Sequence, residues 1–188
     1  MITSMFNHVA YYPTLLFNVL RNKAGPTDWP WYSRIDNNVI LGALPTKSML
    51  NELIEKEKVG AVVCMTMPHE VNNFFAAGRS DFEKLGVKYY ACPSNDFNPN
   101  LKARDVHEAV KFIRQFENTD KSVYVHCKAG RARSAVTVMC YVMERYKYYS
   151  PAAYTMIKPK RPQIALKGFH WNLIEFYAKS YLWNAMNN

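Results

Sequence analysis

The stretch from His126 to Ser134 combines residue types that could perform nucleophilic chemistry on an anion. It reads His-Cys-Lys-Ala-Gly-Arg-Ala-Arg-Ser, with Cys127 and Arg133 separated by five residues. A cysteine and an arginine at this spacing arise by chance in roughly one such chain in five. A glycine at the third position after the cysteine and a serine or threonine at the seventh lower that chance to below about one in a thousand. This stretch is therefore the strongest chemical signal in the sequence.

The residue types in this loop match what a phosphate group needs. A strand pattern leads into the loop and a helical pattern begins near Arg131, so backbone N–H groups and the positive end of a helix can surround an anion. The planar guanidinium of Arg133 can hold two phosphate oxygens. The same positive field favours the thiolate of Cys127, which is its nucleophilic form. Ser134 can hydrogen-bond that sulfur or assist breakdown of a phosphorylated cysteine. The alternative is a structural cysteine in an ordinary turn.

A general acid is also needed, because the leaving oxygen must receive a proton. Asp96 lies 31 residues before Cys127 (127 − 96), in the polar loop Pro93–Asn100 that follows a predicted strand. The carboxyl ends of neighbouring parallel strands meet at one edge of a sheet. We therefore predict that Asp96 is the general acid, the alternative being an aspartate that only forms a turn.

The rest of the chain alternates between strand and helix patterns. Strands are predicted at 39–42, 61–65, 87–91 and 122–126, and helices at 46–58, 101–116, from 131, from 150–151 and from 169 toward 183. Such alternation predicts an α/β fold with a mainly parallel central sheet flanked by helices. In such a fold the functional loops lie at the carboxyl ends of the strands, which is where Cys127 falls.

Composition limits the class of protein. The chain has 188 residues, which suits one domain. Its 24 basic residues against 15 acidic ones give a net charge of +9, which favours anionic partners. The alternative is an ordinary solvated basic surface. No nucleic-acid-binding motif is present, so we predict no nucleic-acid partner. The four cysteines lack a secretory context and metal-ligand spacing, so we predict no disulfide framework, no metal and no cofactor.

The first 28 residues differ from the rest. Residues 1–27 contain no acid, and the apolar stretch 9–20 is followed by Arg21 and Lys23. That stretch is too short to span a bilayer. It could be an interfacial membrane anchor, a targeting segment, or a helix packed on the domain. A turn-rich stretch at 23–30 separates it from a phosphatase domain that we expect at 29–185.

The motif and its flanks resemble the dual-specificity branch of the protein tyrosine phosphatases. Within that branch the chain resembles the mitochondrial phosphatases that act on phosphatidylglycerophosphate. The resemblance covers nearly the whole chain and rests on the loop 126–134 and on these further stretches: Tyr12-Pro13-Thr14-Leu15-Leu16, Trp31-Tyr32-Ser33-Arg34-Ile35-Asp36, Leu41-Gly42-Ala43-Leu44-Pro45 and Arg161-Pro162. The low-molecular-weight phosphatases are excluded, because they carry such a loop near the N-terminus.

The resemblance implies roles for particular residues. Cys127 would be the nucleophile, Arg133 the phosphate binder and Asp96 the general acid. The loop residues expected to contact substrate are His126, Lys128, Ala129, Gly130, Arg131 and Ala132. A helper loop is expected near 66–70, where Glu70 fits the family and His69 departs from it. His170 stands where relatives often have Gln or Asn to position water, so its role is open.

The predicted substrate is a phospholipid. Lys128 and Arg131 make the loop more basic than phosphotyrosine requires, which suits a polyanionic lipid headgroup. Alternatively, these charges only hold an acid of the scaffold. We predict dephosphorylation of phosphatidylglycerophosphate in cardiolipin synthesis, with peripheral membrane contact at the matrix side of the mitochondrial inner membrane. Phosphoproteins are the alternative substrates, and a catalytically silent phosphate-binding module is the alternative from another class.

Overall fold

The computed structural model describes residues 29–71, 74–96 and 100–183. Among these residues, no helix is long and apolar enough to cross a membrane. The N-terminal segment 1–28 lies outside the described residues, so its three alternative roles and the domain boundary at residue 29 stay predictions. The four cysteines are all buried and unpaired with one another.

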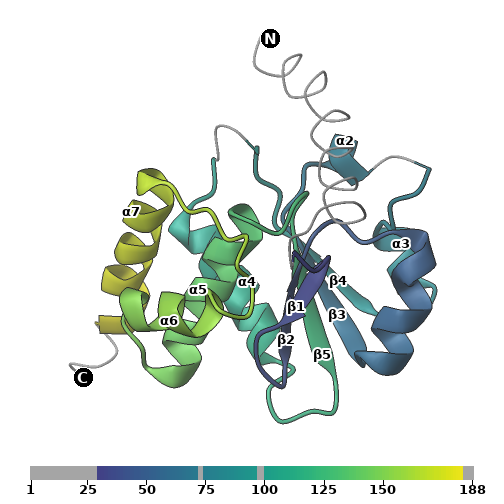
Figure 1. Ribbon diagram of the computed structural model, residues 1–188, viewed down its shortest axis with the longest axis horizontal. Coiled ribbons are helices and arrows are strands. Elements are labelled where there is room, and N and C mark those ends of the chain that lie inside the picture. Colours follow the sequence, from purple (N-terminus) through teal and green to yellow (C-terminus); the bar gives the residue numbers. More distant parts are fainter. Residues whose placement is uncertain (1–28, 72–73, 97–99, 184–188) are drawn as a thin grey trace, which may run out of the picture.

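A five-stranded sheet forms the centre of the molecule (Figure 1). Its strands lie in the order β1-β2-β5-β3-β4, with β1 antiparallel to β2 and the other pairings parallel. Their bounds are Tyr32–Arg34 (β1), Val39–Gly42 (β2), Val59–Cys64 (β3), Lys88–Ala91 (β4) and Ser122–His126 (β5). His126 pairs with both Gly42 and Cys64, so β2, β3 and β5 end at one level. We call this the catalytic edge.

Helices cover both faces of the sheet (Figure 1). One face carries α4 (Ala103–Arg114), α5 (Arg133–Tyr146), α6 (Ser150–Ile157), α7 (Gly168–Tyr177) and the π-helical turn η3 (Ala178–Trp183). The other carries η1 (Lys47–Met49), η2 (Glu52–Lys56) and α3 (Arg79–Glu83), while the short α2 (Pro68–Val71) lies at the catalytic edge. Because both faces are covered, the inner strands β2, β3 and β5 are nearly uninterrupted runs of buried residues.

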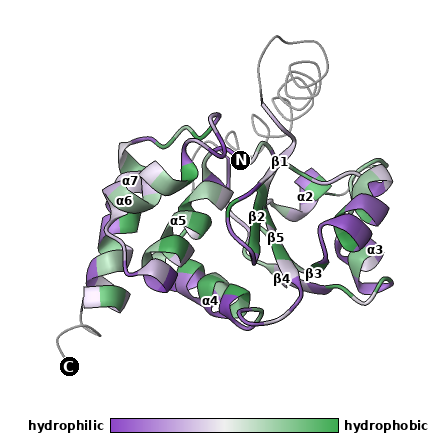
Figure 2. Cartoon of the chain, turned by 60° about the horizontal axis from the view of Figure 1, so that its bottom comes forward, coloured by the Kyte–Doolittle hydropathy of each residue, from purple (hydrophilic) through white to green (hydrophobic). Residues whose placement is uncertain are grey.

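Two apolar cores follow from this layering. The larger lies between the sheet and helices α4 to α7, and the smaller lies under η2 and α3. Figure 2 shows the apolar colouring concentrated on the inner strands and on α5. Helix α5 is buried on every side over its first eleven residues, Arg133 to Met143. The start of this helix, which closes the cysteine loop, is thereby fixed inside the molecule.

The predicted parallel sheet and most predicted elements are confirmed, with differences at some ends. The helix predicted at 46–58 is instead a 3-10 turn followed by a π-helical turn. Thr46 does not cap it, because its hydroxyl pairs with Ser48 rather than with a backbone N–H. Helix α5 begins at Arg133, two residues later than predicted. Strand β1 and the short helices α2 and α3 were not predicted.

Candidate active site

The loop that follows β5 turns its backbone carbonyls outward. Each carbonyl from Cys127 to Ala132 has a partner that lies outside the loop's centre. The Cys127 carbonyl lies 3.3 Å from His126 Nδ1, and the Lys128 carbonyl accepts from Leu44 N at 3.1 Å. Arg161 donates to the carbonyls of Ala129 (3.3 Å) and Gly130 (2.6 Å), while those of Arg131 and Ala132 accept from Ala165 N (3.0 Å) and Val136 N (2.9 Å). Because the C=O and N–H of one trans peptide group point in opposite directions, this arrangement directs the N–H groups toward the centre. The loop and the start of α5 therefore form a concave site suited to an anion.

Gly130 and Arg161 shape this loop together. Gly130 has a φ of +63°, in the left-handed region that glycine adopts readily. A Cβ atom there would lie 2.4 Å from both the Arg161 guanidinium and the Gly42 carbonyl oxygen. The glycine thus lets the buried Arg161 approach closely enough to bond Ala129 and Gly130 at once. Burial lowers the pKa of Arg161 to about 10.

Cys127 lies at the base of the loop, where its sulfur accepts a hydrogen bond from Ser134 Oγ at 3.2 Å. Burial alone would raise the pKa of this thiol, but the Arg133 guanidinium and the hydrogen bonds from Ser134 outweigh it. The pKa of Cys127 is therefore lower than that of an ordinary cysteine. This geometry stabilises a thiolate, which can attack phosphorus.

Arg133 is clamped from three sides. Glu70 on α2 accepts from both terminal nitrogens, at 2.7 and 3.0 Å, and the Ser94 carbonyl accepts at 2.7 Å. Both Arg133 and Glu70 are almost fully buried. A bidentate carboxylate fixes the plane of the guanidinium, so its remaining donor edge is held in one orientation for an anion. Glu70, which the resemblance placed in a helper loop, thus contacts the side chain of Arg133, the predicted phosphate binder.

Asp96 completes the constellation. Its two oxygens lie 3.0 Å from Arg133 Nη2 and 2.5 Å from Lys128 Nζ. Burial would raise the pKa of this carboxyl, but Arg133 and Lys128 outweigh burial and hold the pKa below its usual range. The predicted nucleophile, phosphate binder and acid are therefore brought together, although Asp96 comes from a different loop than Cys127 and Arg133.

The other predicted contact residues lie around this centre. Lys128 is buried against Asp96, so its charge contacts the predicted general acid rather than an acid of the scaffold. Arg131 donates to the Gln163 carbonyl at 3.2 Å and lies 5.1 Å from the Trp29 ring. Ala129 and Ala132 contribute backbone to the turn. His126 is fully buried beneath the loop.

The two histidines with open roles differ in position. His69 lies half-buried on α2, beside the clamp. His170 is buried at the start of α7, where its Nδ1 accepts a hydrogen bond from the Lys167 backbone N–H at 3.0 Å. This contact caps the helix, which is a structural role. Burial and the nearby Lys167 lower the pKa of His170 to about 4.

Sequence reasoning missed the residues behind the loop. Cys64, at the end of β3, bonds Thr66 Oγ1 at 2.9 Å and lies beside His126. Burial lowers the pKa of His126, but the Cys64 thiol outweighs that effect and raises it. Arg161 was noted only as part of a family stretch. The one signal in the sequence was that Arg161 precedes a proline. This pair does not reveal that Arg161 contacts two carbonyls of the cysteine loop.

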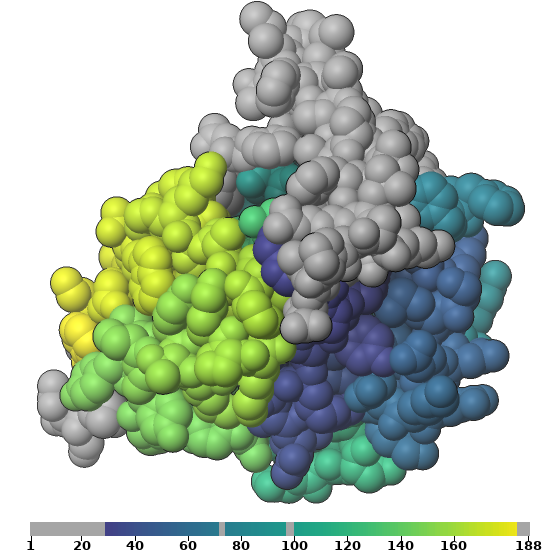
Figure 3. Space-filling model, in the orientation of Figure 1, coloured from purple at the N-terminus to yellow at the C-terminus, as the bar shows by residue number. Residues whose placement is uncertain are grey.

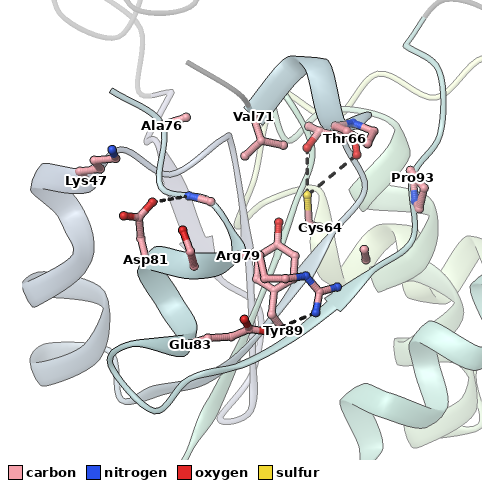
Figure 4. A pocket seen from close by; sticks show the side chains of 14 residues that line it. Lys47, Cys64, Thr66, Val71, Ala76, Arg79, Asp81, Glu83, Tyr89 and Pro93 are labelled. Atoms are coloured by element: carbon pink, nitrogen blue, oxygen red, sulfur yellow. Dashed lines mark hydrogen bonds and ion pairs between the residues drawn. The ribbon is translucent and has the colours of Figure 1, made fainter. Parts of the chain in front are cut away.

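A cavity of about 540 Å³ lies beside α2, next to the end of β3 (Figure 4). Cys64, Thr66 and Tyr89 line it together with Pro68 and Val71 of α2. The Arg79 guanidinium lies 4.9 Å from the Tyr89 ring and pairs with Glu83. The helix that carries Glu70 is therefore backed by open space rather than by packed core.

Comparison with protein families gives a match across most of the described domain. The model of the dual specificity phosphatase catalytic domain matches residues 39–179. The chain belongs to the dual-specificity phosphatase family. It is therefore a phosphatase, and the Cys127 loop lies in the region that defines the family.

Individual relatives extend the match beyond the family domain. The chain is 32% identical over 181 residues to the Rattus norvegicus protein named phosphatidylglycerophosphatase and protein-tyrosine phosphatase 1, covering 96% of this chain and 93% of the relative. It is 32% identical to the Arabidopsis thaliana phosphatidylglycerophosphate phosphatase PTPMT1, covering 89% of this chain and 48% of the relative. A crystal structure of PTPMT1 in complex with PI(5)P superposes with a TM-score of 0.78 at 29% identity, covering 83% of this chain and 99% of that one.

Proposed function

We propose that this phosphatase removes the terminal phosphate of phosphatidylglycerophosphate through a cysteinyl-phosphate intermediate, giving phosphatidylglycerol for cardiolipin synthesis. The observation that carries the chemistry is the loop itself: six carbonyls face outward around Cys127, whose pKa is lowered beside Arg133. The lipid substrate is supported by relatives named for it that match up to 96% of the chain.

The reaction would proceed in two displacements. In the first, the Cys127 thiolate attacks phosphorus, the bond from phosphorus to the glycerol oxygen breaks, and Asp96 gives its proton to that oxygen. In the second, water attacks the phosphocysteine, Asp96 takes a proton from the water, and Cys127 leaves as a thiolate. The loop N–H groups and Arg133 stabilise charge on the phosphoryl oxygens in both steps.

Substrate binding would also prepare the acid. At rest the Asp96 carboxylate is paired with Arg133 and Lys128, so it is ionised and holds no proton to donate. A phosphate dianion in the loop competes for Arg133 and adds negative charge nearby. Both effects raise the pKa of Asp96. The acid is thereby protonated only when a phosphate is present.

The setting of the enzyme belongs to the same proposal. The net charge of +9 suits contact with an anionic membrane surface. We place the enzyme peripherally at the matrix side of the mitochondrial inner membrane, as the resemblance implies. Phosphoproteins are the competing substrates, because the rat relative's name also includes protein-tyrosine phosphatase activity.

A substrate panel on the purified chain tests the proposal. Phosphate release from phosphatidylglycerophosphate, from a phosphotyrosine peptide and from an aryl phosphate is measured for the wild type and for Cys127→Ser. We expect the highest kcat/KM on the lipid and no release by the variant on any substrate. A higher kcat/KM on the peptide would replace the lipid by a phosphoprotein, and an active Cys127→Ser would rule out the cysteine mechanism.

A further inference from the structure

Large aromatic side chains are exposed on both sides of the catalytic edge. Phe74 and Phe75, between α2 and α3, are 93% and 43% exposed, and Phe169 in the first turn of α7 is 44% exposed. The described residues between α2 and α3 lie at the outside of the molecule in Figure 1, and the same region reaches the outer surface in Figure 3. We call these three residues the aromatic rim.

Both parts of the rim are tied to the active site. Phe75 O accepts from Lys47 N at 2.9 Å, which anchors the base of the first segment. Phe74 itself lies four residues after Glu70, the clamp on Arg133, in the sequence. On the other side, Ala165 N donates to the Arg131 carbonyl of the catalytic loop at 3.0 Å, four residues before Phe169. A surface that contacts the rim therefore faces the catalytic loop.

Cations accompany the aromatic residues. Lys47, Lys102 and Lys167 are exposed at the same edge, next to Phe75, the Asp96 loop and Phe169 respectively. The carboxylates of Glu70 and Asp96 are already paired with Arg133, and Asp81 accepts from Gly78 N. Asp105 and the adjacent Arg104 are both exposed at the start of α4 and offset each other. The edge thus presents exposed phenylalanines among lysines.

We infer that the aromatic rim inserts into the headgroup region of an anionic bilayer and so delivers Cys127 to lipid phosphates. This inference rests on the proposed lipid substrate. A phosphatase acting on a membrane lipid must bring its loop to the bilayer surface, and Cys127 is itself buried. Phenylalanines that insert between acyl chains, with lysines facing anionic headgroups, are the composition that interfacial binding uses.

Vesicle sedimentation of the full chain tests the rim directly. The variant Phe74→Ser is compared with the wild type on vesicles of phosphatidylcholine with about one-fifth phosphatidylglycerol. Neither lipid is a substrate, so the result does not depend on the proposed activity. Phe176→Ser is the matched control, because Phe176 is 61% exposed near the other end of α7. Phe74→Leu is the conservative variant.

The expected result is a loss of vesicle partitioning of about fivefold for Phe74→Ser, with Phe176→Ser and Phe74→Leu close to the wild type. Activity on a soluble aryl phosphate should be unchanged in all three, which shows that the loop is intact. Equal partitioning of Phe74→Ser and wild type would overturn the inference, as would no vesicle binding by the wild type. A change from dimer to monomer in Phe74→Ser, without a change in partitioning, would assign the rim to a second copy instead.

Discussion

The pairing of Asp96 with two cations explains how the proposed acid can rest as a stable anion. Arg133 and Lys128 together keep the pKa of Asp96 below its usual range in the free enzyme. In the proposed mechanism Arg133 also binds phosphate, whereas Lys128 contacts Asp96 from within the loop at 2.5 Å. The effects of these two cations on the pKa of Asp96 can therefore be tested separately by mutation.

Replacing Lys128 by Met should raise the pKa of Asp96, because one of its two cations is lost. Since catalysis needs the protonated acid, activity falls as pH rises through that pKa. The falling limb of the kcat/KM profile should therefore move to higher pH in Lys128→Met, by about one unit. The measurement is a pH–rate profile on an aryl phosphate.

Asp96→Asn serves as the control for this profile. It should lose the falling limb and retain a low activity, because no proton is donated at any pH. A falling limb that stays in place in Lys128→Met, or that persists in Asp96→Asn, would show that another group is the acid.

At the scale of residues, the sequence predicted the cysteine loop but not the side chain that holds Arg133 in place. Cys127, Arg133 and Ser134 lie close together in the chain, and their spacing, together with Gly130, predicts a phosphate site. Glu70 lies 63 residues before Arg133, and no pattern identifies which acid will pair with it. Its contact depends on where β3 ends, so only the fold reveals it.

At the scale of elements, the segment after α6 holds the catalytic loop in shape. Arg161 is fully buried, and among the described residues its guanidinium donates to carbonyls and one hydroxyl rather than to a carboxylate. Such a cation is costly to bury unless its donors are satisfied. The burial of Arg161 therefore depends on its hydrogen bonds to the carbonyls of Gly130 and Ala129, and these bonds keep both carbonyls turned outward.

Arg161→Met should misplace the loop amides and lower kcat/KM by about 100-fold, since small displacements at a reacting centre have effects of that size. It should also weaken binding of a phosphate analogue such as vanadate. Both are measured on folded protein, judged by circular dichroism. Lys160→Met is the matched control, because Lys160 bonds the Ile35 carbonyl, away from the loop. Unchanged kinetics in folded Arg161→Met would contradict this account.

His170 gives the start of α7 a pH-dependent cap. Its pKa is lowered to about 4, so between pH 4 and its unfolded pKa the unfolded chain binds a proton that the folded chain excludes. The free energy of unfolding should therefore fall as pH falls through this window, by on the order of 2 kcal/mol. Urea unfolding at several pH values measures this loss.

His170→Gln should reduce that loss, because a glutamine at this position can still accept from the Lys167 N–H without titrating. His107→Gln is the matched control, since His107 is half-buried and stacks on Tyr181. If His170→Gln lost stability on acidification as steeply as the wild type, the effect would belong to other groups.

The elements show where pattern reading succeeds and fails. Buried strands such as β3 and β5 are continuous apolar runs, which sequence reveals directly. Strand β1 has only three residues, and its pairing with β2 is set by the turn at 35–38 rather than by periodicity. The stretch 46–58 has a helical pattern, but the pattern does not specify the hydrogen-bond spacing, which here is 3-10 and then π.

At the scale of the whole molecule, the net charge of the protein is opposite in sign to the charge of the proposed lipid substrate. The net charge of +9 is distributed over a chain whose relatives are named for acting on an anionic lipid. Attraction between an excess of basic residues and an anionic surface acts over the Debye length, which is about 10 Å at 0.1 M salt. Fold class and net charge were both readable from the sequence, but the side of the molecule proposed to meet the membrane could be chosen only from the structure.

Salt should therefore reduce turnover of phosphatidylglycerophosphate presented in phosphatidylglycerol vesicles. Each exposed basic residue near an anionic membrane contributes about 1 kcal/mol of attraction, and this attraction is screened. Raising the salt concentration from about 0.05 to 0.3 M, where the Debye length shortens, should lower kcat/KM by about tenfold. The measurement is phosphate release at fixed lipid concentration.

Presenting the same substrate in neutral detergent micelles separates attraction to the membrane surface from attraction to the substrate's own headgroup. The phosphate monoester is anionic in both cases, but only the vesicle adds a field from neighbouring lipids. In micelles we expect the same salt increase to lower kcat/KM by no more than about twofold, because only local contacts with Arg133 and the loop are screened. Equal salt dependence in vesicles and micelles would show that the net charge serves the active site rather than recruitment to the membrane.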